Sequence, residues 1–266
     1  MNMRRVFVLG GLCLATVTVP LALSAGLSSA APRNAAANGV LYGALGADTS
    51  SSDLYRIDRN TGAATPIGPI GDAVSGLAFV NGTLYGVTTG NSAAHKHKLI
   101  SIDTSTGAGT VIGSTCNNIG DLASRGGVLY GWCEDGDDLY TINTATGTAT
   151  LVGESDTNSS GDAMSFDAKG RLYAAFRQVG DDGQVYRINP STGTTTAIAL
   201  LKGGLKKDSN RLSGGSFGCD GRTFYAIELR GRPAVQAALV TLDIARGAIS
   251  VIGETVNPMD ALVWKC

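Results

Sequence analysis

The chain has 266 residues, with 21 Lys and Arg against 22 Asp and Glu, and a formal net charge of −1. This balance supplies no basic surface of the kind that binds nucleic acid, so a nucleic-acid partner is not expected. Its 37 glycines, together with abundant Thr, Ser and Asn, predict many turns and little helix.

The first 31 residues have the features of a cleaved secretory signal. Arg4 and Arg5 precede an apolar run, and small residues surround a cleavage point near residues 28–31. The arginine pair also fits the twin-arginine route, which stays open as an alternative. No apolar run approaches the roughly 20 residues of a membrane span. We expect residues 1–31 to be removed, residues 32–38 to be a short flexible N-terminus, and the mature protein to be secreted and extracellular.

One phrase recurs five times from residue 39 onward. Each copy begins with a segment such as "VLYGA" or "TLYGV", and then come a second strand, a Thr-Gly turn, a third strand and a fourth apolar segment such as "SGLAFV". The repeated tyrosines, spaced by roughly 43 to 52 residues, are Tyr42, Tyr85, Tyr130, Tyr173 and Tyr225. Four short strands per repeat predict the blades of a β-propeller.

The order of the segments predicts how the ring closes. The chain enters at the second strand of a blade and ends with "MDALVW", a first strand, which should therefore complete blade one. We predict an all-β, five-bladed propeller of four-stranded antiparallel blades over residues 39–266. The expected inner strands lie near 75–80, 119–124, 162–167, 213–218 and 259–264.

The recurring turn, as in "DTSTG", has a local explanation. Its Asp or Asn can accept hydrogen bonds from the amides ahead, and its Gly can adopt the positive φ that the hairpin needs. A ligand loop repeated in each blade is the alternative. The repeats resemble secreted bacterial β-propeller proteins built from "GLAF…G.LYG…LY.ID..TG..T.IG" units, in the style of quinoprotein-like and surface-layer propellers. The resemblance covers residues 39–266 and implies the fold, but no catalytic residue, because such groups include binding modules, lyases and hydrolases.

Four cysteines follow the signal segment, which favours two disulfides in an exported protein. Cys116 precedes an inner strand and Cys133 ends the next strand, so both should lie on one rim. Cys219 and Cys266 each follow an inner strand in blades that adjoin once the ring closes. We predict Cys116–Cys133 and Cys219–Cys266; metal binding by these cysteines is the alternative, although no C-x-x-C spacing supports it.

The two faces of the ring differ in their loops. Strands are counted here from the innermost strand of each blade, such as "SGLAFV". The turns from first to second strand and from third to fourth strand are short and alike, and they define what we call the turn face. The links between blades and the turns from second to third strand vary in sequence, and they define the link face. Variable loops on a rigid frame are a common place for binding sites, so we expect function on the link face.

The "AHKHK" segment on that face holds both histidines of the chain, His95 and His97. Alternate residues of an extended segment point the same way, so the two imidazoles could share a metal ion or an anionic ligand. The alternative is a solvated basic loop.

The segment "DTNSSGD" resembles the front half of a calcium loop. Its oxygen donors would be Asp156 and Asn158, and Asp135 and Asp137 on the neighbouring "CEDGDD" loop could complete the set. Calcium is therefore the cofactor that the sequence suggests, and an Asx-rich turn is the alternative.

Carboxylates occur at or near the starts of four inner strands: Asp72, Asp121, Asp162 and Asp260. If they converge at the channel mouth, pairs of them could protonate and attack a glycosidic bond, with His95 or His97 carrying a proton. Roles in lining the channel or capping turns are the alternative.

Few aromatic residues lie outside the repeat positions, which does not support a sugar-stacking site in every blade. Trp132, Arg177 and Arg230 are the expected ligand contacts. "GGSFG" around Ser216 matches G-x-S-x-G, but lies in an expected strand with no helix after it, so it is not a nucleophile elbow.

Two functions from different classes remain. The first is a secreted binding or interaction module, monomeric, for a small molecule, glycan or protein. The alternative is an extracellular hydrolase or lyase that uses the carboxylates at the channel mouth.

Overall fold

The computed structural model describes residues 39–46, 49–178, 183–205, 211–230 and 236–266, with only the backbone of residues 159–162 and 178. The expected signal segment and residues 32–38 lie outside the described residues. All of the described residues fall in one compact unit, Ala35–Cys266. In that part of the chain, no helix is long and apolar enough to cross a membrane.

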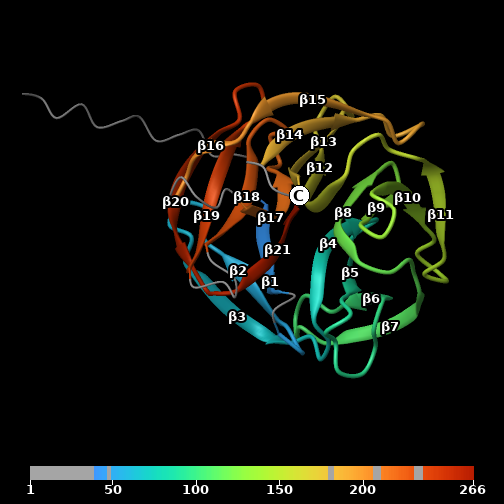
Figure 1. Ribbon diagram of the computed structural model, residues 1–266. Helices are drawn as coiled ribbons and strands as arrows, with labels where there is room; N and C mark the ends of the chain where they lie inside the picture. Colours follow the sequence, from blue (N-terminus) through green and yellow to red (C-terminus); the bar gives the residue numbers. More distant parts are fainter. Residues whose placement is uncertain (1–38, 47–48, 179–182, 206–210, 231–235) are drawn as a thin grey trace, which may run out of the picture. The chain divides into compact units, whose positions relative to one another are not determined.

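The described chain folds into five β-sheets, one for each repeat, and the four main strands of each sheet are antiparallel (Figure 1). Blade 1 contains β21, β1, β2 and β3, from the inner to the outer strand. The strands of blades 1 and 2 are β21 (Met259–Lys265), β1 (Val40–Leu45), β2 (Asp53–Ile57), β3 (Ala64–Pro69), β4 (Val74–Val80), β5 (Thr83–Thr88), β6 (Lys98–Ile102) and β7 (Gly109–Ser114).

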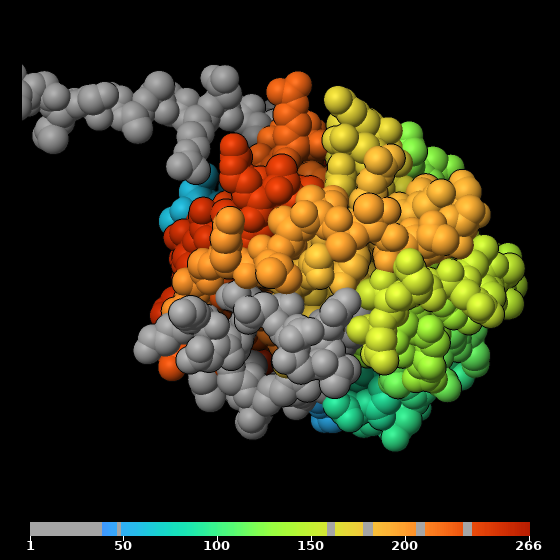
Figure 2. Space-filling view, turned by 45° about the horizontal axis from the view of Figure 1, so that its top comes forward, coloured from blue at the N-terminus to red at the C-terminus, as the bar shows by residue number. Residues whose placement is uncertain are grey.

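Blades 3, 4 and 5 repeat the same up-and-down order. In Figure 2 their sectors follow one another around the surface from yellow-green through orange to red. Their strands are β8 (Ile119–Arg125), β9 (Val128–Cys133), β10 (Asp138–Ile142), β11 (Ala149–Gly153), β12 (Ser159–Phe166), β13 (Leu172–Gln178), β14 (Gln184–Ile188), β15 (Thr195–Leu200), β17 (Arg211–Phe217), β18 (Phe224–Arg230), β19 (Gln236–Asp243) and β20 (Ala248–Thr255).

The ring closes as predicted. The last strand, β21, pairs antiparallel with the first, β1, with Val263 opposite Tyr42. Around the axis the inner strands contact one another in the order β21, β4, β8, β12, β17 and back to β21. The repeat pattern did not predict β16 (Lys202–Gly203), a short fifth strand that pairs parallel with β20 at the edge of blade 5.

The core is divided among the joints between blades. Each of five hydrophobic clusters combines side chains from two neighbouring blades. Each repeat tyrosine belongs to or packs against one of these clusters, which explains why this tyrosine recurs in every unit. A single blade has no separate core, so burial of apolar area requires its neighbours.

The Thr-Gly turns have the predicted geometry and a second role. In the turn of blade 2, the carboxylate of Asp103 accepts the amide of Ser105 at 2.7 Å, and Gly107 has φ of +85°. A Cβ atom on Gly107 would lie 2.3 Å from the carbonyl oxygen of Gly68 in blade 1. The turn glycine therefore shapes the hairpin and also allows two blades to touch backbone to backbone.

Both predicted disulfides are present. Cys116 pairs with Cys133 in blade 3, and Cys219 pairs with Cys266, with Cα atoms 6.4 Å and 5.4 Å apart. The second bridge connects blade 5 to the strand that closes blade 1, across a sequence separation of 47 residues. The two bridges indicate an oxidising environment.

Candidate functional site

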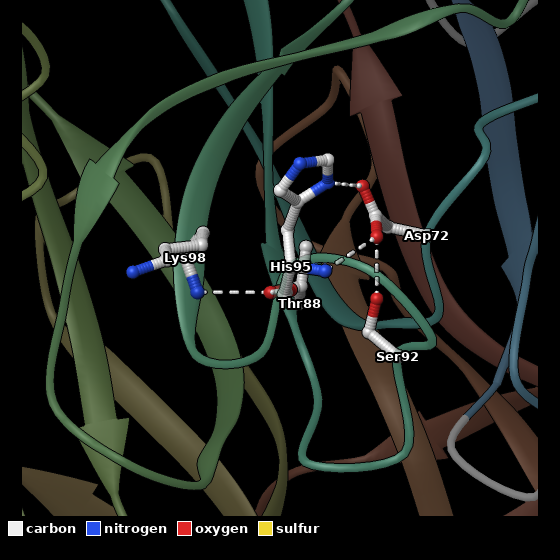
Figure 3. A network of polar contacts seen from close by, with 5 residues as sticks. All are labelled: Asp72, Thr88, Ser92, His95 and Lys98. Carbon is white, nitrogen blue, oxygen red and sulfur yellow. Dashed lines mark hydrogen bonds and ion pairs between the residues drawn. The ribbon is translucent and has the colours of Figure 1, made fainter.

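The candidate site on the link face is built around Asp72, just before inner strand β4. Its side chain is 9% exposed and faces the turn between β5 and β6 (Figure 3). One carboxylate oxygen accepts the hydroxyl of Ser92 and the backbone amide of His95, the latter at 3.2 Å. The other lies 2.9 Å from Nδ1 of His95. One buried carboxylate therefore fixes the loop at three points.

The imidazole of His95 is held but still accessible. Its side chain is 49% exposed, and Figure 3 shows its second ring nitrogen pointing away from Asp72. With Nδ1 donating to the carboxylate, Nε2 carries the lone pair and can accept a proton or a hydrogen bond. The hydroxyl of Thr88 also accepts the amide of Lys98 at 2.8 Å, which secures the far end of the same loop.

His97 is arranged differently, and the two histidines do not form one site. Nδ1 of His97 accepts the backbone amide of Asn118 at 3.3 Å, which places the ring proton on Nε2. His95 therefore presents a lone pair at Nε2 and His97 presents a proton there. Among the described residues, no three His, Cys, Asp or Glu side chains come together as a metal site.

Asp121, in β8, is a structural carboxylate at the axis. It is fully buried, and its Oδ1 accepts the amide of Leu122 at 2.8 Å. Its Oδ2 accepts the amides of Met164, in β12, at 2.8 Å and of Gly215, in β17, at 3.1 Å. One side chain therefore joins the inner strands of three blades.

Asp260 has a similar role where the ring closes. The hydroxyl of Ser213 donates to its Oδ1, and Nη2 of Arg211 lies 3.8 Å from the same oxygen. These contacts tie β17 in blade 5 to β21 in blade 1. Asp162 lies in β12, but its side chain is outside the described part of the structure, so its proposed role stays a prediction.

The four calcium candidates have separate surroundings. Oδ1 of Asp135 accepts the side-chain amide of Asn118 at 2.8 Å. Asp156 accepts the hydroxyl of Thr195 in outer strand β15 at 2.8 Å, and this hydrogen bond lowers the pKa of Asp156. Asn158 is exposed, and Asp137 has a positive φ of 57° in its turn. These contacts match the Asx-rich turn better than a shared calcium cage.

The expected ligand contacts lie at different depths. Trp132 is completely buried and packs on Phe176 with ring centroids 4.5 Å apart, so it belongs to the joint between blades 3 and 4. Arg177 and Arg230 are half-buried near the ends of β13 and β18, on the link face. Ser216 is buried and accepts the amide of Trp264 at 3.2 Å, which connects blades 5 and 1.

The sequence interpretation did not include Ser92, Ser213 or Arg211 among the site residues. Ser92 belongs to no recognisable motif, because its partner Asp72 is 20 positions away in the sequence. The same applies to Ser213, which is 47 positions from Asp260. Folding of blade 2 brings Ser92 to Asp72, and ring closure brings Ser213 of blade 5 to Asp260 of blade 1.

The comparisons with known proteins support the fold. A family model described as "Domain of unknown function (DUF4394)" matches residues 119–216. No curated protein matches the chain. A chain from the crystal structure of a nidogen/laminin complex is similar at 12% identity and a TM-score of 0.57, over 86% of this chain and 99% of that one.

Two bacterial structures are also similar to the chain. A structural genomics protein of unknown function from Bacteroides thetaiotaomicron is 18% identical, with a TM-score of 0.52 over 79% of this chain and 57% of that one. TolB from Acinetobacter baumannii is 18% identical, with a TM-score of 0.47 over 82% of this chain and 53% of that one. The nidogen/laminin chain and the Bacteroides protein have TM-scores above 0.5, and at 12% and 18% identity their similarity shows a common fold and not a common function.

Proposed function

We propose that this protein is an exported propeller that binds a glycan or protein ligand on its link face, at the loop that carries His95 and Lys96. Three hydrogen bonds to the buried carboxylate of Asp72 support this proposal most directly. They fix the loop before a ligand arrives, and a preorganised loop loses less entropy on binding. The disulfides fit an exported protein, and one structural relative comes from a complex of two proteins.

The chemistry of the buried carboxylates favours binding over carboxylate catalysis. Asp121 and Asp260 are each engaged by groups of neighbouring strands. A glycosidase needs one carboxylic acid and one carboxylate that face the scissile bond. A carboxylate that holds the inner strands together cannot take either role without loosening the ring.

The surface near the loop suggests the type of ligand. Lys96 is exposed and makes no ion pair within the described residues, while Asp135 on the adjacent blade is also exposed. Cationic and anionic side chains therefore lie on neighbouring loops. Such a mixed surface suits the polar rim of a protein interface or the hydroxyl groups of a glycan.

The test is binding of the mature protein to a glycan array and to extracellular proteins immobilised from the same source. Lys96→Glu should weaken the interaction by about tenfold, because it replaces an attractive charge with a repulsive one. Lys202→Glu, an equal charge change on the exposed edge strand β16, should leave it unchanged. A ligand bound equally by both variants would place the binding site elsewhere.

A hydrolase that uses His95 as a general base is the second candidate. The 2.9 Å contact of His95 with Asp72 supports it, because this pairing orients a base in acyl-transfer enzymes. The hydroxyl of Ser92 donates to Asp72 and not to His95, so the nucleophile would have to be water. Turnover of esters or lactones that disappears in His95→Gln, with the fold retained, would favour this candidate; turnover that persists would remove it.

A further inference from the structure

A cavity opens on the opposite side of the ring, on the turn face between blades 4 and 5. Its volume is about 510 Å³, which lies within the range of small-molecule sites. Its walls come from the turn after β12, the turn after β17 and the turn after β19. None of these residues belongs to the His95 loop.

The cavity has an excess of positive charge. Lys169, Arg171 and Arg222 line it, against the single carboxylate of Asp167. Lys169 and Arg222 are exposed, and their side chains make no ion pair or hydrogen bond within the described residues. Two cations are therefore available to an incoming anion.

Arg171 is fixed in place by Asp167. Its Nε and Nη2 lie 2.6 Å and 2.5 Å from Oδ2 of that carboxylate, which is buried. Burial alone would raise the pKa of Asp167, but hydrogen bonds and charge from Arg171 lower it overall, so the acid is ionised at neutral pH. Nη1 of Arg171 has no hydrogen bond within the described residues and remains a donor for a ligand.

The inner wall of the cavity is aromatic. Tyr173 and Phe217 meet edge to face with centroids 5.9 Å apart, and the guanidinium of Arg171 lies 5.5 Å from the Tyr173 ring centroid. Ile244 adds an aliphatic side chain. Cationic groups thus stand beside an apolar wall.

The cavity is preformed, because its turns are tied to one another. The amide of Ala168 donates to the carbonyl of Gly221 at 3.2 Å, between blades 4 and 5. On the other side, Nη1 of Arg125 in blade 3 donates to the carbonyl of Gly170 at 2.9 Å. The corresponding turn of blade 2, "NGT", carries no cation, and that of blade 3, "SRGG", carries Arg125 alone, so the cluster of three cations is a feature of the turns of blades 4 and 5.

We propose that this cavity binds a small organic anion: a carboxylate or phosphate group attached to an aromatic or other compact apolar ring. The acidic group would contact Arg171, Arg222 and Lys169, and the ring would pack toward Tyr173 and Phe217. This site is separate from the link face and does not depend on the function proposed there.

The test is calorimetric titration of the mature protein with benzoate and phenyl phosphate. Benzyl alcohol supplies the ring without the charge, and inorganic phosphate supplies the charge without the ring. We expect at least one of the two aromatic anions to saturate the protein and to bind at least about tenfold more tightly than either partial probe, with affinity falling as salt is added. Absence of saturation by both anions at about 10 mM would overturn the proposal.

Matched variants locate the site. Arg222→Gln and Lys169→Gln change exposed side chains that make no hydrogen bond or ion pair within the described residues, and each should weaken binding by about three- to tenfold. Arg187→Gln removes the same charge from an exposed position on β14 and should have no effect. Equal losses in all three variants, or equal binding of phenyl phosphate and inorganic phosphate, would contradict the proposed site.

Discussion

On the link face, the carboxylates of Asp72, Asp121 and Asp260 are buried and accept hydrogen bonds. On the turn face, Lys169 and Arg222 are exposed and make no ion pair within the described residues. The difference separates two uses of charge. A buried carboxylate must be satisfied by neighbouring donors, so it becomes part of the frame. An exposed cation that makes no ion pair keeps its donors open to solvent and is available to a ligand.

The largest expected effect is loss of the carboxylate of Asp121. Asp121→Ala would leave the amides of Leu122, Met164 and Gly215 without an acceptor and lower the free energy of unfolding by about 3–5 kcal/mol. Denaturant unfolding measures it. Asp121→Asn keeps one carbonyl acceptor and should lose less. Equal stability of Asp121→Ala and the wild type would show that the axis does not depend on this side chain.

The turn face also has contacts between neighbouring blades. Two glycines with the same φ allow the effect of such a contact to be measured separately from the effect of backbone strain. Gly107 and Gly82 both have φ of +85°, but only Gly107 touches a neighbouring blade. We expect Gly107→Ala to destabilise the protein by about 2–4 kcal/mol and Gly82→Ala by about 1–2 kcal/mol. Thermal unfolding measures the loss of stability in each variant, and the difference between the two losses is the contribution of the contact between the blades. Similar losses would mean that φ alone requires the glycine.

A smaller effect is expected at the loop of the candidate binding site. Asp72→Ala removes acceptors of Ser92 and His95 and should cost about 1–2 kcal/mol. Amide hydrogen exchange of residues 89–97 should accelerate, while exchange in the inner strands should change little. Unchanged exchange in the loop would remove the main support for a preorganised binding surface.

The sequence predicted the parts of this frame that depend on local chemistry. The Asp103 turn and the positive φ of Gly107 follow from a few adjacent residues, and the repeat period led to five blades and to the closing pair of β1 and β21. Both disulfides followed from the ring.

The contacts of the site were harder to predict. Asp121 was singled out as a candidate acid, but its acceptor role depends on Gly215, which is 94 positions away. The turn-face cavity could not be predicted from the length of its turns, because these turns are short in every blade. "AKGR" and "CDGR" differ from "VNGT" by an arginine whose neighbours only the folded ring supplies.

The smallest expected effect concerns Glu228. This side chain is buried like the acids of the link face, but only one of its two carboxylate oxygens accepts a hydrogen bond within the described residues. It is 1% exposed, its Oε2 accepts the amide of Leu205 at 2.9 Å, and its Oε1 has no hydrogen bond within the described residues. Burial raises the pKa of Glu228 above the ordinary value of 4.5, and the Leu205 amide offsets only part of this. The folded state therefore holds the proton more tightly than the unfolded state does.

Stability from this proton is fully present below the carboxyl's unfolded pKa and is lost as the pH rises through the raised value. Glu228→Gln cannot ionise. The melting temperature of the variant minus that of the wild type should therefore increase between about pH 4 and about pH 8, by roughly 2–4 °C for each kcal/mol of stability that the wild type loses. Glu154→Gln, at an exposed carboxyl, is the matched control and should follow the wild-type curve. Parallel curves for all three proteins would show that burial does not raise the pKa of Glu228 in the folded ring. The ring would then tolerate a buried carboxylate with one oxygen that lacks a hydrogen bond within the described residues.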